Sequence, residues 1–339
     1  AAIEGARIID VSGKVVVPGF VDWHCHLREP GQEERETFDT GTRAAAIGGY
    51  TTVCAMANTA PPVDTRAAVE FVVNESRRRG VIRVLPVACV TKGQQGAELT
   101  EMADLIDAGA VAFSDDGIPI RNARVMRHAL EYSRMLGVPI IDHAEDPNLA
   151  NPGLMHEGAV SDRLGVPGNP WAAESIAVAR DVELAALTNS WVHIAHLSTR
   201  RAVEIVRDAK ARGLQVTAEA TPHHLVLTDA WAAGRMLVSD PAAEPFYALL
   251  RPPAGRAPYD TNCRVAPPLR TTEDAQAVLE GLRDGTIDIV ATDHAPHTAV
   301  DKAQEFGLAP CGISGIETAF ASLMTLVHAG QLSFVDLIR

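Results

Sequence analysis

The segment from Val15 to Gly31 reads VVVPGFVDWHCHLREPG, and it predicts a buried strand followed by a loop. The apolar, β-branched run favours a strand over residues 15–22, and the Pro-Gly pair at the end favours a loop. Because side chains alternate across a strand, we expect His24 and His26 to share one face and Cys25 to pack on the other. Two imidazoles on one face are half of a metal site, so the remaining ligands must come from elsewhere in the chain.

Composition excludes several classes of protein. The 339 residues are 47% apolar and 22% charged, which is typical of a soluble globular protein. We find neither the roughly 20-residue apolar run of a membrane helix nor a signal segment. Five scattered cysteines favour reduced thiols and a cytoplasmic location. A net charge of −13 argues against nucleic acid and anionic membranes as partners, although it permits a small anionic substrate.

Strand and helix patterns alternate eight times along the chain. The predicted strands cover residues 15–22, 51–56, 81–89, 110–114, 138–142, 191–195, 214–219 and 286–291. The predicted helices cover residues 34–47, 65–79, 98–108, 122–136, 172–189, 199–212, 272–284 and 315–328. Short apolar strands separated by helices indicate a parallel sheet covered on both faces, and eight such units predict an α/β fold of the (β/α)8, or TIM-barrel, type. An open doubly wound sheet is the alternative, but no glycine-rich nucleotide loop follows the first strand.

The barrel is expected to occupy residues 15–330. Residues 1–14 look like the end of another unit, and residues 331–339 look like the start of a helix with Ser333 as its N-cap. A proline-rich connection at about residues 230–262 shows no clear period. A loop of that length is either a functional lid or a disordered insertion, and both interpretations stay open.

Chemically competent side chains gather where the predicted strands end, which is where the active site of such a barrel lies. They are His24, His26, Arg28, Asn58, Asp115, Asp116, His143, Glu145, His196, Glu219, His223, His224, Asp293, His294 and His297. Nine of the twelve histidines lie in these segments or on the strands that lead to them. Such clustering is improbable by chance, so scattered core or surface histidines do not explain the group.

The individual residues differ in their most reasonable role. We interpret His24, His26, His143 and His196 as metal ligands, and Asp293 as functional rather than a helix cap. One of Asp115 and Asp116 is expected to cap and the other to ligate. The remaining histidines are interpreted as a packed core residue (His193), as structural or substrate-contacting residues (His223, His224), and as solvated surface residues (His128, His156, His328).

Four histidines and two aspartates exceed the needs of one tetrahedral zinc ion. They suit two divalent ions that share a bridging carboxylate and a bridging hydroxide. A neighbouring carboxylate can take and return a proton, and the planar fork of Arg28 suits a substrate carboxylate. The residues alone therefore predict metal-assisted attack on a carbonyl or amide of a small anionic molecule.

The motifs resemble those of the amidohydrolase superfamily and, within it, the class I dihydroorotases. The matching runs are DWHCHLREPG at 22–31, Asn58-Thr59 with Pro61 and Asp64, TKG at 91–93, FSDDG at 113–117, DHAE at 142–145, HLST at 196–199, TPHHL at 221–225, PPLR at 267–270 and ATDHAPH at 291–297. The resemblance covers nearly the whole chain. Arg28 is its most specific element, because allantoinases typically carry Asn at that position.

The resemblance implies a role for each matching residue. His24, His26 and Asp293 would hold one zinc ion, His143 and His196 the second, and Asp116 would bridge them where relatives use a carboxylated lysine. Asp293 would also be the general acid/base. The implied substrate contacts are Arg28, Asn58, His297 and the backbone of Cys311 and Gly312.

The implied reaction is the reversible cyclisation of N-carbamoyl-L-aspartate to L-dihydroorotate, the third step of de novo pyrimidine synthesis, in which the bridging hydroxide attacks the ring amide. The resemblance also implies a small flanking β-sandwich, of which residues 1–14 would be a remnant and to which residues 331–339 would lead back. A homodimer and an association with aspartate transcarbamoylase are further implications.

Three positions depart from the family pattern, which usually has Pro at Ala57, Asn at Ala266 and Phe at Cys311. Ala266 matters most, because that Asn is among the family's substrate contacts. One alternative is another cyclic amidase, such as a hydantoinase or an allantoinase, in which a carboxylated lysine bridges the metals. Lys92 is the nearest candidate for such a lysine, but it follows strand three rather than strand four. A second alternative, a non-catalytic homologue that serves as a scaffold for aspartate transcarbamoylase, is disfavoured because all four histidines are present.

Overall fold

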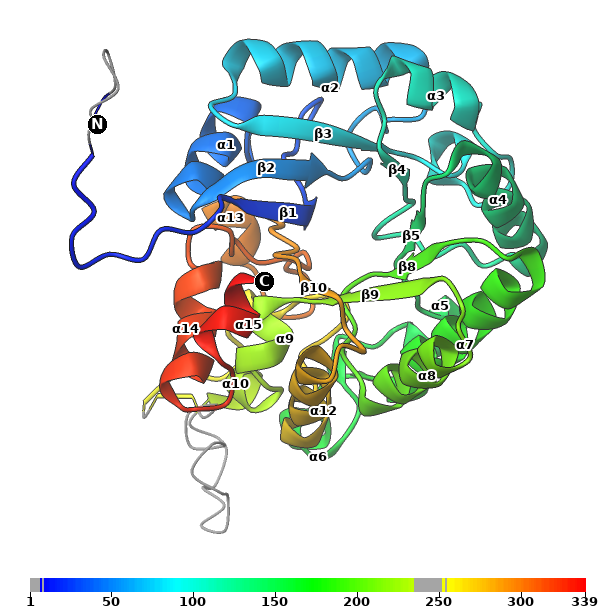
Figure 1. The fold of residues 1–339 in the computed structure, drawn as a ribbon. Coiled ribbons are helices and arrows are strands. Elements are labelled where there is room, and N and C mark those ends of the chain that lie inside the picture. The colour runs from blue at the N-terminus through cyan, green and yellow to red at the C-terminus, as the bar shows by residue number, and fades with distance from the viewer. Residues whose placement is uncertain (1–6, 8, 235–251, 254) are drawn as a thin grey trace.

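The computed structural model describes residues 7, 9–234, 252–253 and 255–339. Within them, eight strands form one sheet in the order β1-β2-β3-β4-β5-β8-β9-β10, and every neighbouring pair is parallel. The strands are β1 Phe20–Cys25, β2 Tyr50–Ala55, β3 Arg83–Ala88, β4 Ala112–Phe113, β5 Ile140–Asp142, β8 Val192–Ile194, β9 Val216–Ala220 and β10 Ile289–Val290. The predicted TIM barrel is confirmed (Figure 1).

The ring closes between the first and the last strand, just beyond their ends. A single bridge joins Cys25 to His294. The backbone N–H of His26 donates to the carbonyl of His294 at 2.8 Å, and that of Asp293 donates to the carbonyl of His24 at 2.9 Å. The buried Asp22 carboxylate accepts from the backbone N–H and the hydroxyl of Thr292 at 2.9 and 2.5 Å. This seam is therefore held mainly by residues at or next to the predicted metal ligands.

The helices form a ring outside the strands (Figure 1). The eight that match the predicted set are α1 Phe38–Ile47, α2 Arg66–Arg79, α3 Met102–Ala108, α4 Ala123–Leu136, α7 Trp171–Thr188, α8 Arg200–Ala211, α12 Thr272–Arg283 and α14 Ala319–His328. Most begin where a Thr or Asn side chain accepts a hydrogen bond from the first turn, as Thr37, Thr65, Asn122, Thr199 and Thr271 do. The main apolar core lies between the sheet and these helices.

The first strand begins five residues later than predicted. Val15 and Val16 lie outside the sheet and are 70% and 73% exposed, and β1 starts only at Phe20. Pro18 cannot donate to a sheet ladder, and a Cβ at Gly19 would lie 2.1 Å from the Thr51 side chain, so a larger residue cannot occupy this approach to the sheet. The shift places His24 inside β1 rather than beyond its end. Cys25 belongs to the barrel–helix core, as expected.

The connection from β5 to α7 contains small elements that were not predicted. They are α5 Pro147–Ala150, α6 Ala159–Leu164 and a parallel pair, β6 Met155–His156 with β7 Gly168–Asn169. His156 lies here and is buried, so its interpretation as a surface residue was wrong. Burial and the neighbouring Arg270 guanidinium lower the pKa of His156 to about 4. The reason for the error is that the connection itself packs down: Met155, next to His156, and Leu164 join a second apolar cluster that includes Leu269 and Phe306.

Much of the proline-rich connection, including the part that would form a lid, lies outside the described residues. Its described ends are α10 Ala230–Ala233 and a short 3-10 turn, Thr261–Cys263. Two hydrogen bonds from Tyr259 fix the second end. Its N–H donates to the carbonyl of Ala232 at 2.8 Å, and its hydroxyl donates to the carbonyl of Leu164 at 2.9 Å.

The two flanks of the barrel, residues 1–14 and 331–339, were expected to belong to structure outside it. Residues 9–14 contain no strand, and helix α15, Phe334–Ile338, begins after Ser333, whose hydroxyl accepts the capping hydrogen bond. The expected N-cap is therefore confirmed, while the β-sandwich remnant stays a prediction. In the part of the chain that the structure describes, no helix has the length and apolar character required to cross a membrane.

Candidate metal centre

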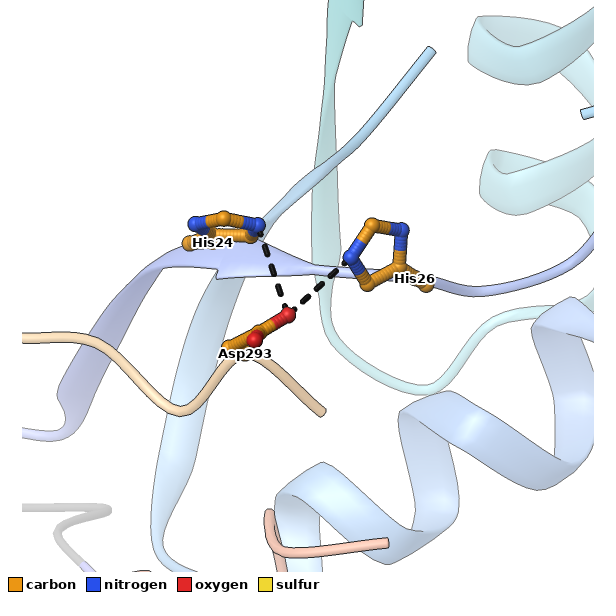
Figure 2. Close-up of side chains that lie close together, drawn as sticks. All are labelled: His24, His26 and Asp293. Carbon is orange, nitrogen blue, oxygen red and sulfur yellow. Dashed lines mark hydrogen bonds and ion pairs between the residues drawn. The ribbon is translucent and has the colours of Figure 1, made fainter. Parts of the chain in front are cut away.

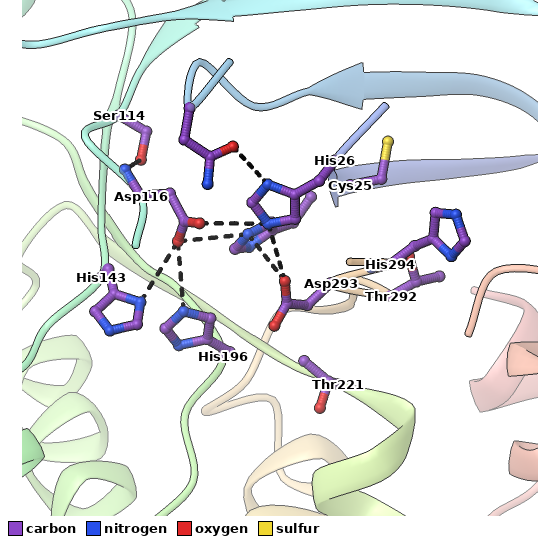
Figure 3. Close-up of polar contacts among 12 residues, drawn as sticks. Cys25, His26, Ser114, Asp116, His143, His196, Thr221, Thr292, Asp293 and His294 are labelled. Carbon is purple, nitrogen blue, oxygen red and sulfur yellow. Dashed lines mark hydrogen bonds and ion pairs between the residues drawn. The ribbon is translucent and has the colours of Figure 1, made fainter. Parts of the chain in front are cut away.

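Six ionisable side chains from five strand ends converge at the carboxyl end of the barrel (Figure 3). All six are buried. They are His24 on β1 and His26 just after it, Asp116 after β4, His143 after β5, His196 after β8 and Asp293 after β10. The structure thus brings together every residue that was predicted to hold a metal.

Asp116 stands at the centre of the group. Its Oδ1 lies 3.5 Å from His24 Nε2, 3.6 Å from His143 Nδ1 and 3.5 Å from His196 Nε2, and its Oδ2 lies 3.4 Å from His26 Nε2. One carboxylate therefore faces all four imidazoles, which is the position that a bridging ligand between two ions would take.

Asp293 closes the side of the group nearest β1 (Figure 2). Its Oδ1 lies 3.1 Å from His26 Nε2 and 3.5 Å from His24 Nε2. Ligand atoms of His24, His26 and Asp293 lie within 4.8 Å of one another, as do those of His24, Asp116 and His196. The two sets share His24 and give two adjacent places for a cation.

The donor atoms fit a divalent cation. His24 Nε2, His143 Nδ1, His196 Nε2 and Asp116 Oδ1 are buried and have no hydrogen-bond partner. Buried polar atoms are rarely left in this state, and each exception calls for an explanation. Imidazole nitrogens and carboxylate oxygens are ligands that zinc accepts. Metal coordination would satisfy all four atoms at once.

The backbone at this end of the barrel is held in an unusual conformation. His196, Asp293 and Arg28 have φ values of 32°, 45° and 61°, in the left-handed region that non-glycine residues rarely occupy. Such residues cluster at functional sites, where the surrounding structure fixes a side chain in a direction that relaxed backbone would not give.

Charge in the cluster is strongly coupled. Burial alone would lower the pKa of His24, but the carboxylates of Asp116, Glu219 and Asp293 raise it well above its usual value. For His143, burial is likewise outweighed by Asp116, and the pKa rises to about 9. Burial opposes the ionisation of Asp293, yet His24 and His26 hold the pKa of Asp293 well below its usual range. Without a metal, protons on His24 and His143 balance the acids, and a divalent cation would replace them.

The predicted substrate contacts form one side of the same end of the barrel. Arg28 is buried, and its Nε donates to the carbonyl of Pro296 at 3.1 Å, while its Nη2 lies 3.4 Å from His297 Nε2. The same His297 nitrogen lies 2.7 Å from the carbonyl oxygen of Cys311. Gly312 has a φ of 137°, and a Cβ there would lie 2.9 Å from His297 Nε2, so glycine is required.

Asn58 lies beside this group, and its side-chain oxygen is already hydrogen-bonded. Its Oδ1 is 2.8 Å from His26 Nδ1, so the amide oxygen orients a predicted metal ligand. Burial, followed by the nearby Arg35, lowers the pKa of Arg28 to about 10, which leaves the guanidinium charged at neutral pH.

The contacts of Asp115 and Lys92 show what these two candidate residues do. Asp115 accepts from the backbone N–H groups of Val90 and Thr91 at 2.9 and 3.1 Å, so it holds the loop after β3 rather than capping the following helix, whose N-cap is Asn122. Asp116 faces the histidines, and its role as the ligating member of the pair stays a prediction. Lys92 pairs with Glu98 at 2.5 Å and has a substantially exposed side chain. It is not among the metal-facing residues, which argues against a carboxylated lysine at this position.

Sequence reasoning missed how Glu219 and His193 are used. Glu219 was noted at a strand end without a role, and His193 was interpreted as a packed core residue, yet they bind each other and Glu219 binds His24. Thr217, which contacts His193, lies two positions before Glu219 on the same strand. This spacing places the two side chains on one face of the strand, and it was the signal in the sequence for a polar group there. His223 and His224 are both buried. His224 Nε2 lies 3.0 Å from the Pro267 carbonyl oxygen, whereas His223 Nε2 has no partner.

Comparison with known proteins identifies the family to which the chain is similar. A model of the dihydro-orotase-like family matches residues 13–202. A dihydroorotase of Pelotomaculum thermopropionicum is 51% identical over 330 residues, which span 97% of this chain and 71% of that protein. A dihydroorotase of Thermoanaerobacter sp. (strain X514) is 48% identical over 333 residues, which span 98% of this chain and 72% of that protein.

Among solved structures, L-hydantoinase (dihydropyrimidinase) from Arthrobacter aurescens matches with a TM-score of 0.81. The match covers 99% of this chain and 72% of that chain, at 24% sequence identity. Similarity at this level of identity shows that the two proteins share a fold.

Proposed function

The chain belongs to the dihydroorotase family, and we propose that it carries out the dihydroorotase reaction with two divalent metal ions, preferably zinc, held by the six buried ligands. The reaction is the reversible interconversion of N-carbamoyl-L-aspartate and L-dihydroorotate. The observation that carries the proposal is Asp116, whose two oxygens lie 3.4–3.6 Å from ring nitrogens of four different histidines.

The ligands divide into two sets around Asp116. His24, His26 and Asp293 would hold one ion, and His143 with His196 would hold the other. When bound, such ions polarise a carbonyl and lower the pKa of water. The protein's contribution is to keep the donor atoms buried, close together and correctly directed.

Asp293 would transfer the proton. In the ring-opening direction, water adds to the ring amide carbonyl, the carbon–nitrogen bond breaks, and Asp293 moves a proton from the attacking water to the leaving nitrogen. Its carboxylate is held ionised by His24 and His26, so it begins the reaction as a base. Cyclisation reverses these steps.

Arg28 would recognise the substrate carboxylate. Its Nε is fixed by the Pro296 carbonyl, and its buried guanidinium lies beside His297. Charged donors in a buried site bind carboxylates more strongly than neutral donors do. Asn58, His297 and the backbone at Cys311 and Gly312 would complete the substrate site.

The decisive experiment pairs metal analysis with turnover measurements on three substrates. We expect about two metal equivalents per chain and turnover of dihydroorotate in clear preference to hydantoin and allantoin. Two bound metals without turnover of dihydroorotate would contradict the proposed function. Turnover of hydantoin in preference would instead favour another cyclic amidase.

Three further properties belong to the proposal. A homodimer and an association with aspartate transcarbamoylase follow from the family resemblance, and light scattering of the protein, alone and mixed with that enzyme, tests both. A cytoplasmic location is supported by the five cysteines, all of which are free thiols in the structure.

A further inference from the structure

Glu219 lies on β9 inside the barrel, is fully buried and uses both carboxylate oxygens. Its Oε1 accepts from His24 Nδ1 at 2.6 Å and from the backbone N–H of His196 at 3.2 Å. Its Oε2 accepts from His193 Nε2 at 3.1 Å. One side chain thus contacts a ligand of each proposed metal position, because His24 is assigned to the ion held with His26 and Asp293, and His196 to the ion held with His143.

These contacts fix the direction of His24. An ionised carboxylate only accepts hydrogen bonds, so the proton of a neutral His24 must be on Nδ1. The lone pair of Nε2 then points toward Asp116 and Asp293, each with an oxygen 3.5 Å away. A carboxylate on the far nitrogen of a ligating histidine also increases its basicity and holds its ring plane.

Glu219 also holds the strained backbone at His196. The side chain of Glu219 accepts from the N–H of His196, and its backbone carbonyl accepts from the next N–H, that of Leu197, at 2.9 Å. These two hydrogen bonds bracket the residue whose φ is 32°. Without these two hydrogen bonds, fewer contacts would hold His196 in a backbone conformation that non-glycine residues disfavour.

The hydrogen bonds continue away from the metal centre in one direction. If His193 Nε2 donates to Glu219, then Nδ1 of neutral His193 must accept, and the Thr217 hydroxyl lies 2.9 Å from it. The Thr217 oxygen in turn accepts from Trp191 Nε1 at 2.8 Å. Each donor meets an acceptor along Trp191, Thr217, His193 and Glu219. These hydrogen bonds therefore fix Glu219 on the side that faces away from the metal centre.

We propose that Glu219 is a positioning residue that sets both metal positions, by orienting the His24 ring and by holding the His196 backbone, and that His193 keeps Glu219 in place. The inference rests on the proposed metal centre and deepens it. Glu219 does not touch the substrate and takes no part in proton transfer.

The test is the metal affinity of the Glu219→Gln variant, measured by competition with a chromophoric zinc chelator. An amide has one acceptor oxygen and an NH₂ group, so it cannot accept from both His24 and His193. We expect the affinity for both metal equivalents to fall by roughly 10–100-fold, the usual effect of losing such a partner. The low-field proton NMR signal of His24 Nδ1–H should shift or disappear.

Glu174→Gln is the matched control. Glu174 is also a buried glutamate, but it accepts from the backbone and hydroxyl groups of Ser198 and Thr199 rather than from a histidine ring. We expect it to lower the melting temperature while leaving metal affinity and the His24 signal unchanged. Equal loss of metal affinity in the two variants would reduce Glu219 to a general structural role and overturn the proposal.

His193→Ala provides a second route if Glu219→Gln does not fold. It removes the donor to Oε2 and leaves the contact between Glu219 and His24, so we expect a smaller, severalfold loss of metal affinity, recovered in His193→Gln. Unchanged metal affinity in His193→Ala would overturn the role of His193, and unchanged affinity in Glu219→Gln would overturn the whole inference. A wild-type protein that binds two metals but does not turn over dihydroorotate would contradict the proposed function alone.

Discussion

The two ends of the barrel differ in the polarity and the exposure of their side chains. At the carboxyl end of the strands, charged and polar side chains are buried, and Arg28, His196 and Asp293 have positive φ. At the amino end, an apolar groove of about 850 Å³ lies open between the segment around Val15 to Val21, the start of β10 and the C-terminal helix α15. The end that carries buried charge and backbone strain is therefore the end that carries the chemistry.

This difference has a physical reason. Buried, partly unpaired charge and strained backbone lower stability, so they persist only where they serve a function. Exposed valines at the other end carry no such penalty and make few contacts, so their replacement should matter little. Substitutions placed at matched positions on the two ends can test this contrast directly.

The largest effect is expected for Asp293→Asn, just beyond the end of β10. The amide keeps the shape and tolerates the left-handed backbone, but it cannot accept the proton, so kcat should fall by about 10²–10⁴-fold. Steady-state kinetics on dihydroorotate measures this loss. The control is Asp288→Asn just before the same strand, where the carboxylate pairs with Lys210 and lines the apolar groove. It should leave kcat unchanged, and equal losses in the two variants would remove the contrast between the ends.

A smaller effect is expected for Arg28→Lys. Lysine keeps the charge but loses the planar fork and the Nε donor to Pro296, so KM for dihydroorotate should rise by roughly 10–100-fold, with a lesser change in kcat. Arg43→Lys on the exposed face of α1 is the control. An unchanged KM in Arg28→Lys would show that the substrate carboxylate binds elsewhere.

The pH dependence of metal binding comes next in size. In the metal-free protein the pKa of His143 is raised to about 9, so a metal must displace its proton below that pH. The affinity of the metal position that contains His143 should rise up to tenfold per pH unit and level off near pH 9, with proton release visible by calorimetry in buffers of different ionisation enthalpy. The same proton stabilises the metal-free fold fully below pH 6.5, and that contribution is lost as the pH rises through about 9. Metal affinity independent of pH between 6.5 and 9 would contradict the charge coupling.

The smallest effect is expected for Val16→Ser at the amino end. The valine is 73% exposed and outside the sheet, so the free energy of unfolding should change by no more than about 0.5 kcal/mol and the kinetics should not change. Chemical denaturation and a standard assay suffice as measurements. A destabilisation of several kcal/mol would mean that the Val16 side chain is covered in solution.

Much of the fold and of the metal set could be predicted because both depend on local periodicity. The alternation of strand and helix determines a barrel, and a barrel brings its strand ends together. His24, His26, Asp116, His143, His196 and Asp293 could therefore be placed side by side without any knowledge of distances. The N-cap at Ser333 follows from an equally local rule.

What could not be predicted depends on contacts between distant segments. The run at Val15 is apolar and β-branched like a buried strand, but no strand among the described residues pairs with it and its valines are exposed. His156 is buried because the β5–α7 connection packs on residues near Leu269, which no local pattern reveals. The contact of Glu219 with both His24 and His193 depends on how three strands are staggered around the barrel.

The seam between β1 and β10 has a consequence for how the protein is made. His26 and Asp293 meet across that seam, 267 positions apart in the chain. A nascent chain that has emerged only through β9 already contains His24, His26, Asp116, His143 and His196, but it has neither the proton carrier nor the strand that closes the ring. Contacts of such long sequence separation form late, because the intervening chain must first be ordered. The complete set of proposed ligands thus exists only after Asp293 has been synthesised, and we expect metal binding to follow closure of the ring.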